Sequence, residues 1–249
     1  MAARGRPTPQ PAKADRPRFR DRQAYKRSGV NPYVDLHREY AECLLPANDA
    51  WTWRERWSER FGREAPLHLE IGSGNGEFLA ELASRHPDTD FIGVEIRYKR
   101  CVLVAKKLVE AGVHNAVICR YHAAFLDDLL EPGSLDAVYV NHPDPWPKGR
   151  HEKNRLISRW FLEDLCLYLK PGGVFRLKSD HRANIERAEL LIAHEPNGTP
   201  ADPLPLEVSG RSEDVTRLPA PWPDDIETNY QSKFRKRGLP VYAIELRRT

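Results

Sequence analysis

The 249-residue sequence has little sulfur and none of the spacings that bind zinc. It contains one methionine and four cysteines, which lie far apart and form no Cys-x-x-Cys pair. No group of histidines and cysteines has the short spacing of a structural zinc site. We therefore predict no metal site. We interpret the cysteines as buried free thiols in a reducing compartment; they are Cys43, Cys101, Cys119 and Cys166.

The sequence also lacks a long apolar run. No stretch approaches roughly 18 apolar residues in succession, the length that a membrane-spanning helix needs. The first residues have no apolar segment of the kind found in secretory signals. The prolines between Pro7 and Pro17 would interrupt the amphipathic helix of an organellar transit peptide. We expect a cytoplasmic protein with no membrane contact.

Positive charge is concentrated at the N-terminus. Residues 1–30 hold nine arginines and lysines against two aspartates, a net charge of +7, whereas the whole chain carries +3. These residues include few large apolar side chains. We therefore predict a disordered basic arm that either attracts phosphate backbones or acts as a solubilising tail. Residues 31–249 belong to a chain that is 40% hydrophobic and are long enough for one folded domain.

Short apolar segments alternate with helical periods along this domain. We expect strands at residues 67–71, 91–94, 116–119, 135–140, 174–177 and 241–246, and helices at 77–83, 98–111, 123–130, 157–169, 185–194 and 228–237. This alternation predicts an α/β doubly wound sheet, mostly parallel, with an antiparallel C-terminal strand. Two N-terminal helices, at 33–43 and 50–61, are expected to pack on the domain within residues 31–62. The second would do so through Trp53, Trp57 and Phe61.

Three glycines at alternate positions, Gly72, Gly74 and Gly76, separate the first expected strand of the sheet from the next helix. Glycine lets the backbone bend sharply and lets a ligand approach it closely. Glu70 lies just before this turn, where a carboxylate would repel the pyrophosphate of a dinucleotide. It suits the ammonium and sulfonium end of S-adenosylmethionine. Glu95 ends the next strand and can accept hydrogen bonds from both ribose hydroxyls, so together the glutamates favour this cofactor over a structural glycine turn.

The loop after the fourth expected strand is stiff and basic. Prolines on both sides of Asp144 restrict the backbone that presents Asp144 and Trp146, and cations including Lys148 and Arg150 follow. Ligands bind such sheets at the carboxyl ends of the strands, so this loop is expected to face the cofactor. A carboxylate and an aromatic ring beside cations suit a nucleobase and its phosphates. The alternative is a proline-rich surface loop with solvated charges.

These motifs together resemble the tRNA (guanine-N7-)-methyltransferases of the single-subunit bacterial type. The most specific is Pro143-Asp144-Pro145-Trp146-Pro147-Lys148; it stands with Glu70-Ile71-Gly72-Ser73-Gly74-Asn75-Gly76, Lys170-Pro171-Gly172-Gly173 and Ser179-Asp180. The resemblance runs over residues 67–247 and implies a Rossmann-like fold of the class I S-adenosylmethionine-dependent methyltransferases. It implies methyl transfer from S-adenosylmethionine to N7 of a guanine in the variable loop of tRNA. Whether the protein is a monomer or a homodimer stays open.

The resemblance also implies site residues. The cofactor would be bound by Glu70, Gly72, Gly74, Gly76, Glu95, His122 and Asp144. The tRNA would be bound by Lys148, Arg150, Asp180, Thr228, Asn229, Tyr230 and Gln231. We expect Asp144 to lie nearest the reacting atoms as the catalytic residue, with Asp180 as a second contact to the guanine. Lys148 and Arg150 are expected on phosphates.

Two positions depart from the family pattern. His122 stands where the family usually has an aspartate that would contact the adenine. Thr228-Asn229-Tyr230-Gln231 stands where the family has Thr-Lys-Phe-Glu, so one cation and one carboxylate are missing. These changes bear on cofactor affinity and on guanine recognition.

Other functions also remain open. An amino-methyltransferase that acts on an exocyclic nitrogen would use an Asp/Asn-Pro-Pro-aromatic loop, which the segment around Asp144 loosely resembles. A dehydrogenase is opposed by Glu70 and by the glycine spacing. A non-catalytic RNA-binding module would have lost its cofactor through His122 and Gln231.

Overall fold

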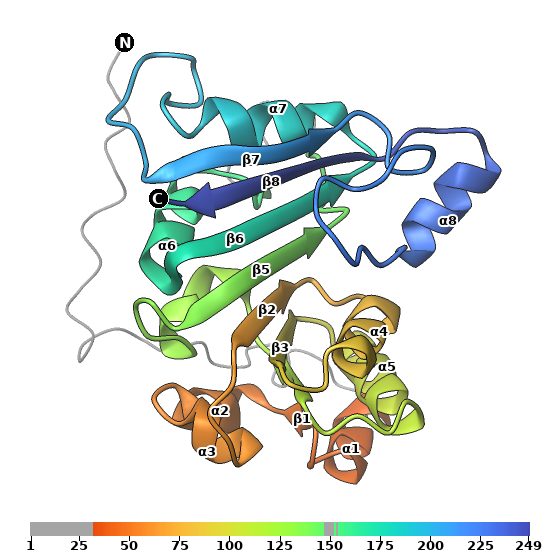
Figure 1. The fold of residues 1–249 in the computed structure, drawn as a ribbon. Coiled ribbons are helices and arrows are strands. Elements are labelled where there is room, and N and C mark those ends of the chain that lie inside the picture. Colours follow the sequence, from red (N-terminus) through yellow and green to blue (C-terminus); the bar gives the residue numbers. More distant parts are fainter. Residues whose placement is uncertain (1–31, 147–151, 153) are drawn as a thin grey trace.

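The computed structural model describes residues 32–146, 152 and 154–249 (Figure 1). The predicted basic arm at 1–30 lies outside these residues, as do Lys148 and Arg150. What the sequence predicts for them therefore stays a prediction.

One sheet of eight strands runs through the described part of the chain. The strands are β1 (Leu44–Leu45), β2 (Leu67–Ile71), β3 (Asp90–Glu95), β4 (Ala116–Arg120), β5 (Leu135–Asn141), β6 (Leu169–Ser179), β7 (Leu206–Ser212) and β8 (Tyr242–Arg248). Their spatial order is β1-β4-β3-β2-β5-β6-β8-β7. Strands β1 to β6 pair in parallel, and β8 is antiparallel to both β6 and β7. This confirms the predicted α/β sheet with its antiparallel C-terminal strand.

Helices cover both faces of this sheet (Figure 1). They are α1 (Pro32–Glu39), α2 (Ala47–Ala50), α3 (Trp57–Phe61), α4 (Glu77–Arg85), α5 (Tyr98–Glu110), α6 (Arg159–Tyr168), α7 (Arg182–Leu190) and α8 (Asn229–Lys236), with the 3₁₀ helices η1 (Trp51–Trp53) and η2 (Ala123–Asp128). One core packs α4 and α5 on the sheet, and α1 lies against α5. The other core packs α3, α6 and α7 on the opposite face.

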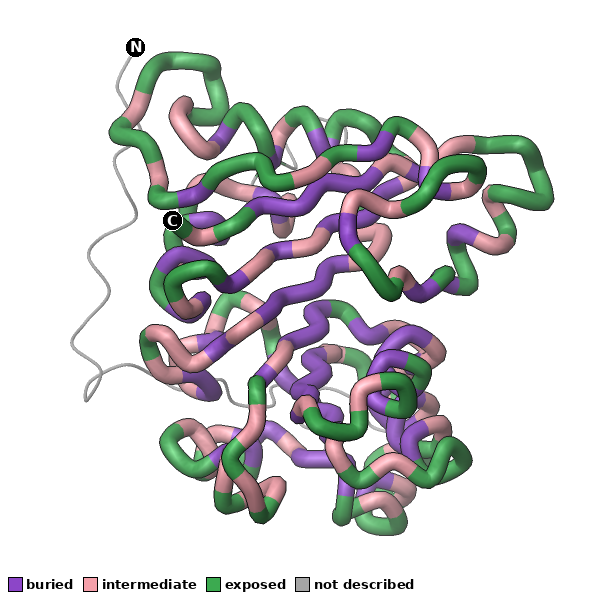
Figure 2. Tube along the Cα trace, in the orientation of Figure 1, coloured by how far each residue is buried: buried purple, intermediate pink, exposed green. Residues whose placement is uncertain are grey.

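Most residues of the central strands are buried (Figure 2). Since successive side chains point to opposite sides of a strand, both faces of these strands are covered. In β3, Phe91 joins the core under α4 and α5, whereas Ile92 joins the core under α6. Strand order reverses at β2, which lies between β3 and β5. The carboxyl ends of β2 and β5 therefore flank the switch point, where open α/β sheets bind ligands.

The N-terminal segment differs from the two helices expected there. Helix α1 ends at Glu39, and Leu44 and Leu45 then pair with Ile118 and Cys119 as an added edge strand. The expected helix at 50–61 is divided among α2, η1 and α3. The sequence pattern could not reveal this, because the partner of β1 lies more than 70 residues away in the chain.

The aromatic residues of this segment are core residues, as expected. Trp57 is buried, and its indole Nε1 donates a hydrogen bond to the carbonyl oxygen of Leu129 at 2.8 Å. Trp53 and Phe61 pack against the same core. Burial of the indole with its N–H satisfied is the arrangement that stabilises a tryptophan in a protein interior.

Three further differences lie in the second half. The expected helix at 123–130 is the 3₁₀ helix η2, which is kinked at Phe125. Lys170-Pro171-Gly172-Gly173, expected as a turn before the strand, lies within β6, where the pairing shifts from Leu135–Leu169 to Ala137–Val174. Strand β7 was not predicted, because most of its side chains are exposed at the edge of the sheet and show no clear alternation.

Within the described ranges, no helix is both long enough and apolar enough to cross a membrane. The same residues contain no cluster of His, Cys, Asp or Glu side chains that could hold a metal ion. The four cysteines are buried free thiols, which confirms their interpretation.

Candidate active site

The glycine turn between β2 and α4 needs its glycines. Gly72, Gly74 and Gly76 have φ values of 80°, 55° and 86°, in the left-handed region that other residues rarely adopt. A Cβ atom on Gly76 would lie 2.6 Å from the Cα of Val104, so this glycine also lets α4 pack closely on α5. The N–H of Gly72 donates to the carbonyl oxygen of Val94 at 2.8 Å. The turn is thus fixed to the end of β3 and presents bare backbone at the switch point.

Glu70 is a buried carboxylate at the carboxyl end of β2, 3% exposed. Burial raises the pKa of Glu70 to about 7, and the charges of Glu95 and Glu77 act in the same direction. The side-chain amide of Asn141, at the end of β5, donates to Glu70 Oε1 at 3.4 Å. Glu70 Oε2 is buried and makes no hydrogen bond of normal geometry with another described residue. The nearby Ser73 hydroxyl and the Asn141 amide lower the pKa of Glu70, against the larger effect of burial. A buried oxygen of this kind is costly unless a ligand donates to it.

Glu95 ends β3 and is oriented by the backbone that follows it. Its Oε1 accepts hydrogen bonds from the N–H groups of Ile96 at 2.8 Å and Arg97 at 2.9 Å. These two bonds hold the carboxylate at the carboxyl edge of the sheet. The same edge carries Glu70 on the neighbouring strand.

His122 follows β4 on the same edge and caps η2. Its Nδ1 accepts a hydrogen bond from the N–H of Ala124 at 3.0 Å, so the proton of the neutral ring lies on Nε2. Burial lowers the pKa of His122, which favours this neutral form. The ring is therefore a hydrogen-bond donor where the family pattern has an acceptor.

Asp144 lies in the loop after β5 and is exposed. Its side chain makes no hydrogen bond or ion pair with the other described residues, whereas the backbone around it is anchored on both sides. The side-chain amide of Asn184 donates to the carbonyl oxygen of Pro143 at 3.2 Å, and Arg155 Nε donates to that of Trp146 at 3.0 Å. The carboxylate is thus presented by an anchored backbone, and no described residue binds it.

Asp180 follows β6, the strand next to β5, and contacts the loop through His142. The Nδ1 atom of His142 lies 3.3 Å from Asp180 Oδ1. This hydrogen bond lowers the pKa of Asp180, and its effect exceeds that of partial burial, which acts in the opposite direction. Asp180 therefore stays ionised near neutral pH. His142 Nε2 lies 2.9 Å from Thr228 Oγ1, so Asp180 and the start of α8 meet at one imidazole.

The C-terminal segment before α8 is held on the sheet by Lys178. This lysine is 1% exposed, and its Nζ donates to Asp225 Oδ2, the carbonyl oxygen of Ile226 and Gln231 Oε1 at 2.7, 2.7 and 3.1 Å. Gln231 Nε2 also donates to the carbonyl oxygen of Val215 at 2.9 Å. The amide of Gln231 is therefore engaged within the fold, where the family's glutamate would place a negative charge beside Lys178.

The neighbouring residues of α8 face outward. Asn229 is exposed, and Tyr230 is 56% exposed. Lys233 Nζ lies 5.6 Å from the centre of the Tyr230 ring. An exposed ring beside a cation offers a stacking surface for a nucleic acid base.

Sequence reasoning assigned no role to His142, Asn141 or Lys178. His142 and Asn141 lie in the loop that was singled out, but only the structure shows that they contact Asp180 and Glu70. Lys178 lies two residues before Asp180 in a strand, where a lysine gives no sign that it is buried. Arg176 and Lys178 alternate with apolar residues in this strand, a pattern that indicates a half-exposed strand and gives no signal of the burial of Lys178.

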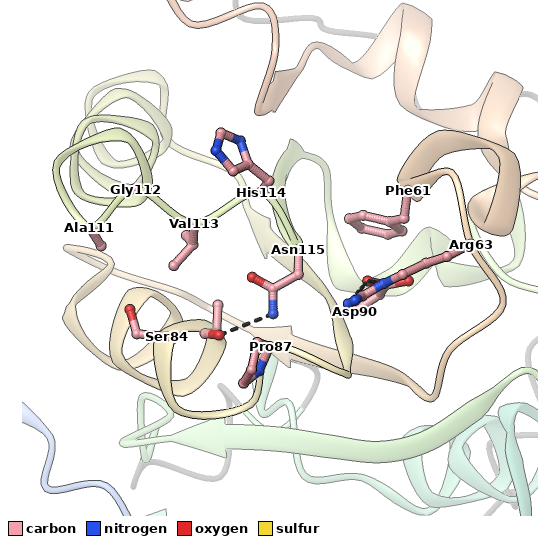
Figure 3. A pocket seen from close by; sticks show the side chains of 11 residues that line it. Phe61, Arg63, Ser84, Pro87, Asp90, Ala111, Gly112, Val113, His114 and Asn115 are labelled. Atoms are coloured by element: carbon pink, nitrogen blue, oxygen red, sulfur yellow. Dashed lines mark hydrogen bonds and ion pairs between the residues drawn. The ribbon is translucent and has the colours of Figure 1, made fainter.

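One surface hollow lies away from these residues. It has a volume of about 440 Å³ and lies at the amino ends of β3 and β4, between α4 and the turn after α5 (Figure 3). Its polar groups are paired within the fold: Arg63 and Asp90 form an ion pair at 2.6 Å, and Asn115 Nδ2 donates to three backbone carbonyls. The hollow is therefore a structural feature on the edge opposite to the glycine turn.

Comparisons with known proteins give one consistent family. Residues 64–205 match the family described as "Putative methyltransferase". The tRNA (guanine-N(7)-)-methyltransferase of Geobacillus kaustophilus is 34% identical over 206 residues, 83% of this chain and 89% of that protein. The protein of the same name from Lactiplantibacillus plantarum is 34% identical over 200 residues, 80% of this chain and 88% of that protein. The solved structure of the 16S rRNA methyltransferase KamB matches with a TM-score of 0.57 at 13% identity, covering 78% of this chain and 93% of that chain.

The sheet order, the glycine turn after β2 and the acidic residues that end β2 and β3 define the class I S-adenosylmethionine-dependent methyltransferase fold, and the likeness to KamB supports that fold alone. Within this class, the chain belongs to the tRNA (guanine-N(7)-)-methyltransferase family.

Proposed function

We propose that this protein transfers the methyl group of S-adenosylmethionine to N7 of a guanine in the variable loop of tRNA. The observation that carries the proposal is the buried carboxylate of Glu70 at the switch point, beside the open glycine turn, whose Oε2 makes no hydrogen bond of normal geometry with another described residue. The held loop with Asp144 follows the strand next to it. The printed names of the relatives, each a tRNA (guanine-N(7)-)-methyltransferase, supply the substrate.

The residues at the carboxyl edge fit the proposed cofactor. Glu70 Oε2 can accept a hydrogen bond from the ammonium group, and a ligand that brings a positive charge would hold Glu70 ionised. The bare backbone of Gly72, Gly74 and Gly76 leaves room for the methionine part. Glu95 is oriented to accept from ribose hydroxyls, and His122 and Asp144 would border the adenine and the sulfonium end. When bound, S-adenosylmethionine supplies a methyl group that is already activated.

The protein's own task is then to bind and orient the guanine. N7 carries a lone pair near neutral pH, so no general base is needed to form the nucleophile. Asp144 and Asp180 can accept hydrogen bonds from N1–H and the N2 amino group on the Watson–Crick edge, which leaves N7 directed toward the cofactor. Holding the two reacting atoms in line at contact distance can supply up to about 7–11 kcal/mol of the rate enhancement.

Positive and aromatic residues around this site would bind the rest of the tRNA. Lys148, Arg150 and the basic residues within 1–30 are proposed to contact phosphates, which position a nucleic acid without reading its sequence. Tyr230 and Asn229, which are exposed on α8, are proposed to contact the substrate directly. Gln231 would act mainly by holding α8 in place, because its amide is engaged by Lys178 and Val215.

The direct test is methylation of tRNA by the purified protein. We expect incubation with S-adenosylmethionine and unmodified tRNA to yield 7-methylguanosine, identified by mass spectrometry of the digested nucleosides. Replacement of the variable-loop guanine by adenine should abolish the product. Methylation of an exocyclic nitrogen would overturn the N7 proposal in favour of an amino-methyltransferase, and tRNA binding without methylation would indicate a non-catalytic module.

Glu95→Ala tests the cofactor part separately. We expect the affinity for S-adenosylmethionine to fall by the equivalent of about 1.5–3 kcal/mol, because the ribose hydroxyls lose a charged acceptor. Isothermal titration calorimetry without tRNA measures this directly. Glu110→Ala is a suitable control, since Glu110 lies at the end of α5 in an exposed pair with Lys106. Equal affinities for the two variants would remove Glu95 from the cofactor site.

A further inference from the structure

The imidazole of His142 joins two segments that the proposed function assigns to the substrate. Its Nδ1 lies 3.3 Å from Asp180 Oδ1, and its Nε2 lies 2.9 Å from Thr228 Oγ1. The ring stacks on that of Tyr230, with centroids 5.2 Å apart and planes at 28°. The side chain is only 6% exposed, so these contacts form in a site that water hardly reaches.

The hydrogen bonds of His142 run in one direction, from the Thr228 hydroxyl through the imidazole to the Asp180 carboxylate. Thr228 Oγ1 caps α8 by accepting from the N–H of Gln231 at 3.0 Å, which leaves the hydroxyl hydrogen of Thr228 available to His142 Nε2. In this arrangement the Nδ1–H of the ring donates a hydrogen bond to Asp180 Oδ1. The N-terminus of α8 is thereby connected to the Asp180 carboxylate through a single side chain.

The backbone of His142 supports a functional role for this arrangement. Its φ is 52°, a conformation that is uncommon for a residue other than glycine. The strain persists because the N–H of His142 donates to the carbonyl oxygen of Lys178 at 2.8 Å and the ring is held on both sides. Asparagine would adopt this backbone more easily, but its short side chain cannot reach Asp180 and Thr228 together. Strained residues that the surroundings hold in place cluster at functional sites.

Asp180 has a second imidazole neighbour, which lies further away. His181 Nε2 lies 3.6 Å from Asp180 Oδ2, and the side chain of His181 is 49% exposed. His142 is closer and buried, so it is the residue that orients the carboxylate.

We infer that His142 is a positioning residue that couples the docking of α8 to the orientation of Asp180. The helix that would contact the tRNA and the carboxylate that would bind the guanine are thereby held in a fixed relation to each other. The inference rests on the proposed function, which assigns Asp180 and Tyr230 to the substrate. It adds a residue whose effect on the reaction runs through others, since His142 itself is covered by Tyr230.

The test compares His142→Phe with His142→Asn. Phenylalanine keeps a ring to stack on Tyr230 but removes both polar atoms, whereas asparagine keeps a donor near the position of Nδ1 but does not reach Thr228. For His142→Phe we expect a single-turnover rate at saturating tRNA that is lower by about tenfold or more, the loss expected for a hydrogen bond to a charged group. We also expect faster amide hydrogen exchange in residues 229–236 and unchanged affinity for S-adenosylmethionine. His142→Asn should recover much of the single-turnover rate, whereas amide hydrogen exchange in α8 should stay fast. A purely structural role would change the rate and the exchange together.

Thr228 provides the second arm of the test. Thr228→Val removes the hydroxyl and Thr228→Ser keeps it, so the serine variant is the matched control. We expect Thr228→Val to reduce the rate in the wild-type background and to have a much smaller effect in the His142→Phe background, because the two side chains act through one chain of hydrogen bonds.

The outcomes separate this inference from the proposed function. Equal effects of Thr228→Val in both backgrounds, or wild-type rate and exchange in His142→Phe, would overturn the coupling while tRNA methylation by the wild-type protein stands. A wild-type protein that does not methylate tRNA would overturn the proposed function and the positioning role with it. The exchange of α8 in His142→Phe would still report the physical link, because that measurement needs no activity.

Discussion

Asp144→Ala is expected to slow methyl transfer by about a hundredfold or more. Bound guanine and cofactor would cover the carboxylate, which is exposed in the free protein, and the loss of an oriented hydrogen bond in such a covered site costs about 2.7–4 kcal/mol in the transition state. The variant should fold normally. The Asp144 carboxylate has no partner among the described residues, and the loop around it is held through the backbone of Pro143 and Trp146. Single-turnover rates at saturating tRNA and cofactor measure the effect without a contribution from binding.

Two control variants sharpen this prediction. Asp88→Ala removes another exposed aspartate that follows a proline, near the amino end of β3, and should leave the rate unchanged. Lys148→Ala should weaken tRNA binding with little change in the saturated rate, because a phosphate contact positions the substrate without touching the reacting atoms. A near wild-type rate for Asp144→Ala would contradict the assignment of Asp144 as the catalytic residue and would favour Asp180 in that role.

Glu70→Gln is expected to stabilise the protein without cofactor at alkaline pH and to weaken cofactor binding. Burial raises the pKa of Glu70 to about 7 from an ordinary value of 4.5, so the folded state holds the proton more tightly than the unfolded state does. The contribution of Glu70 to stability is therefore fully present below pH 4.5 and is lost as the pH rises through 7. Glutamine does not ionise, so the variant should be more stable than the wild type by about 3 kcal/mol at about pH 8.5 and by little at about pH 5.

Urea unfolding at the two pH values measures this difference, and calorimetry measures the affinity for S-adenosylmethionine. The wild-type affinity should increase as the pH rises through 7, since the ionised carboxylate binds the ammonium group, and the variant should lack this increase. Its affinity should be lower by the equivalent of about 1.5–3 kcal/mol. Glu81→Gln on α4 is the control, because Glu81 is half-exposed and paired with Arg85 at 2.7 Å. A stability difference that does not change with pH would contradict the buried, proton-binding state of Glu70.

If Glu70→Gln stabilises the protein but weakens S-adenosylmethionine binding, the result would also explain why a carboxylate is buried at this position. A charge that the fold alone does not satisfy costs stability, and it is retained where a ligand uses it. The structural sign of that balance is the buried Oε2 of Glu70, which makes no hydrogen bond of normal geometry with another described residue.

The local chemistry of this protein could be predicted from its sequence. The turn at Gly72, Gly74 and Gly76, the acidic ends of β2 and β3 and the stiff loop around Asp144 are each encoded by a few neighbouring residues. Their meaning depends on spacing and on backbone preferences that act over short distances. The parallel order of the central strands follows from the alternation of strands and helices.

Only the tertiary structure decided which of these residues meet. The pairing of Leu44–Leu45 with β4, the edge strand β7, the burial of Lys178 and the bond between Asn141 and Glu70 all join residues that are far apart in the chain. His142 contacts Asp180 and Thr228, which lie 38 and 86 residues away. Buried hydrogen bonds of this kind form because packed elements place polar groups where water cannot satisfy them, and a sequence pattern read over ten or twenty residues carries no signal of that meeting.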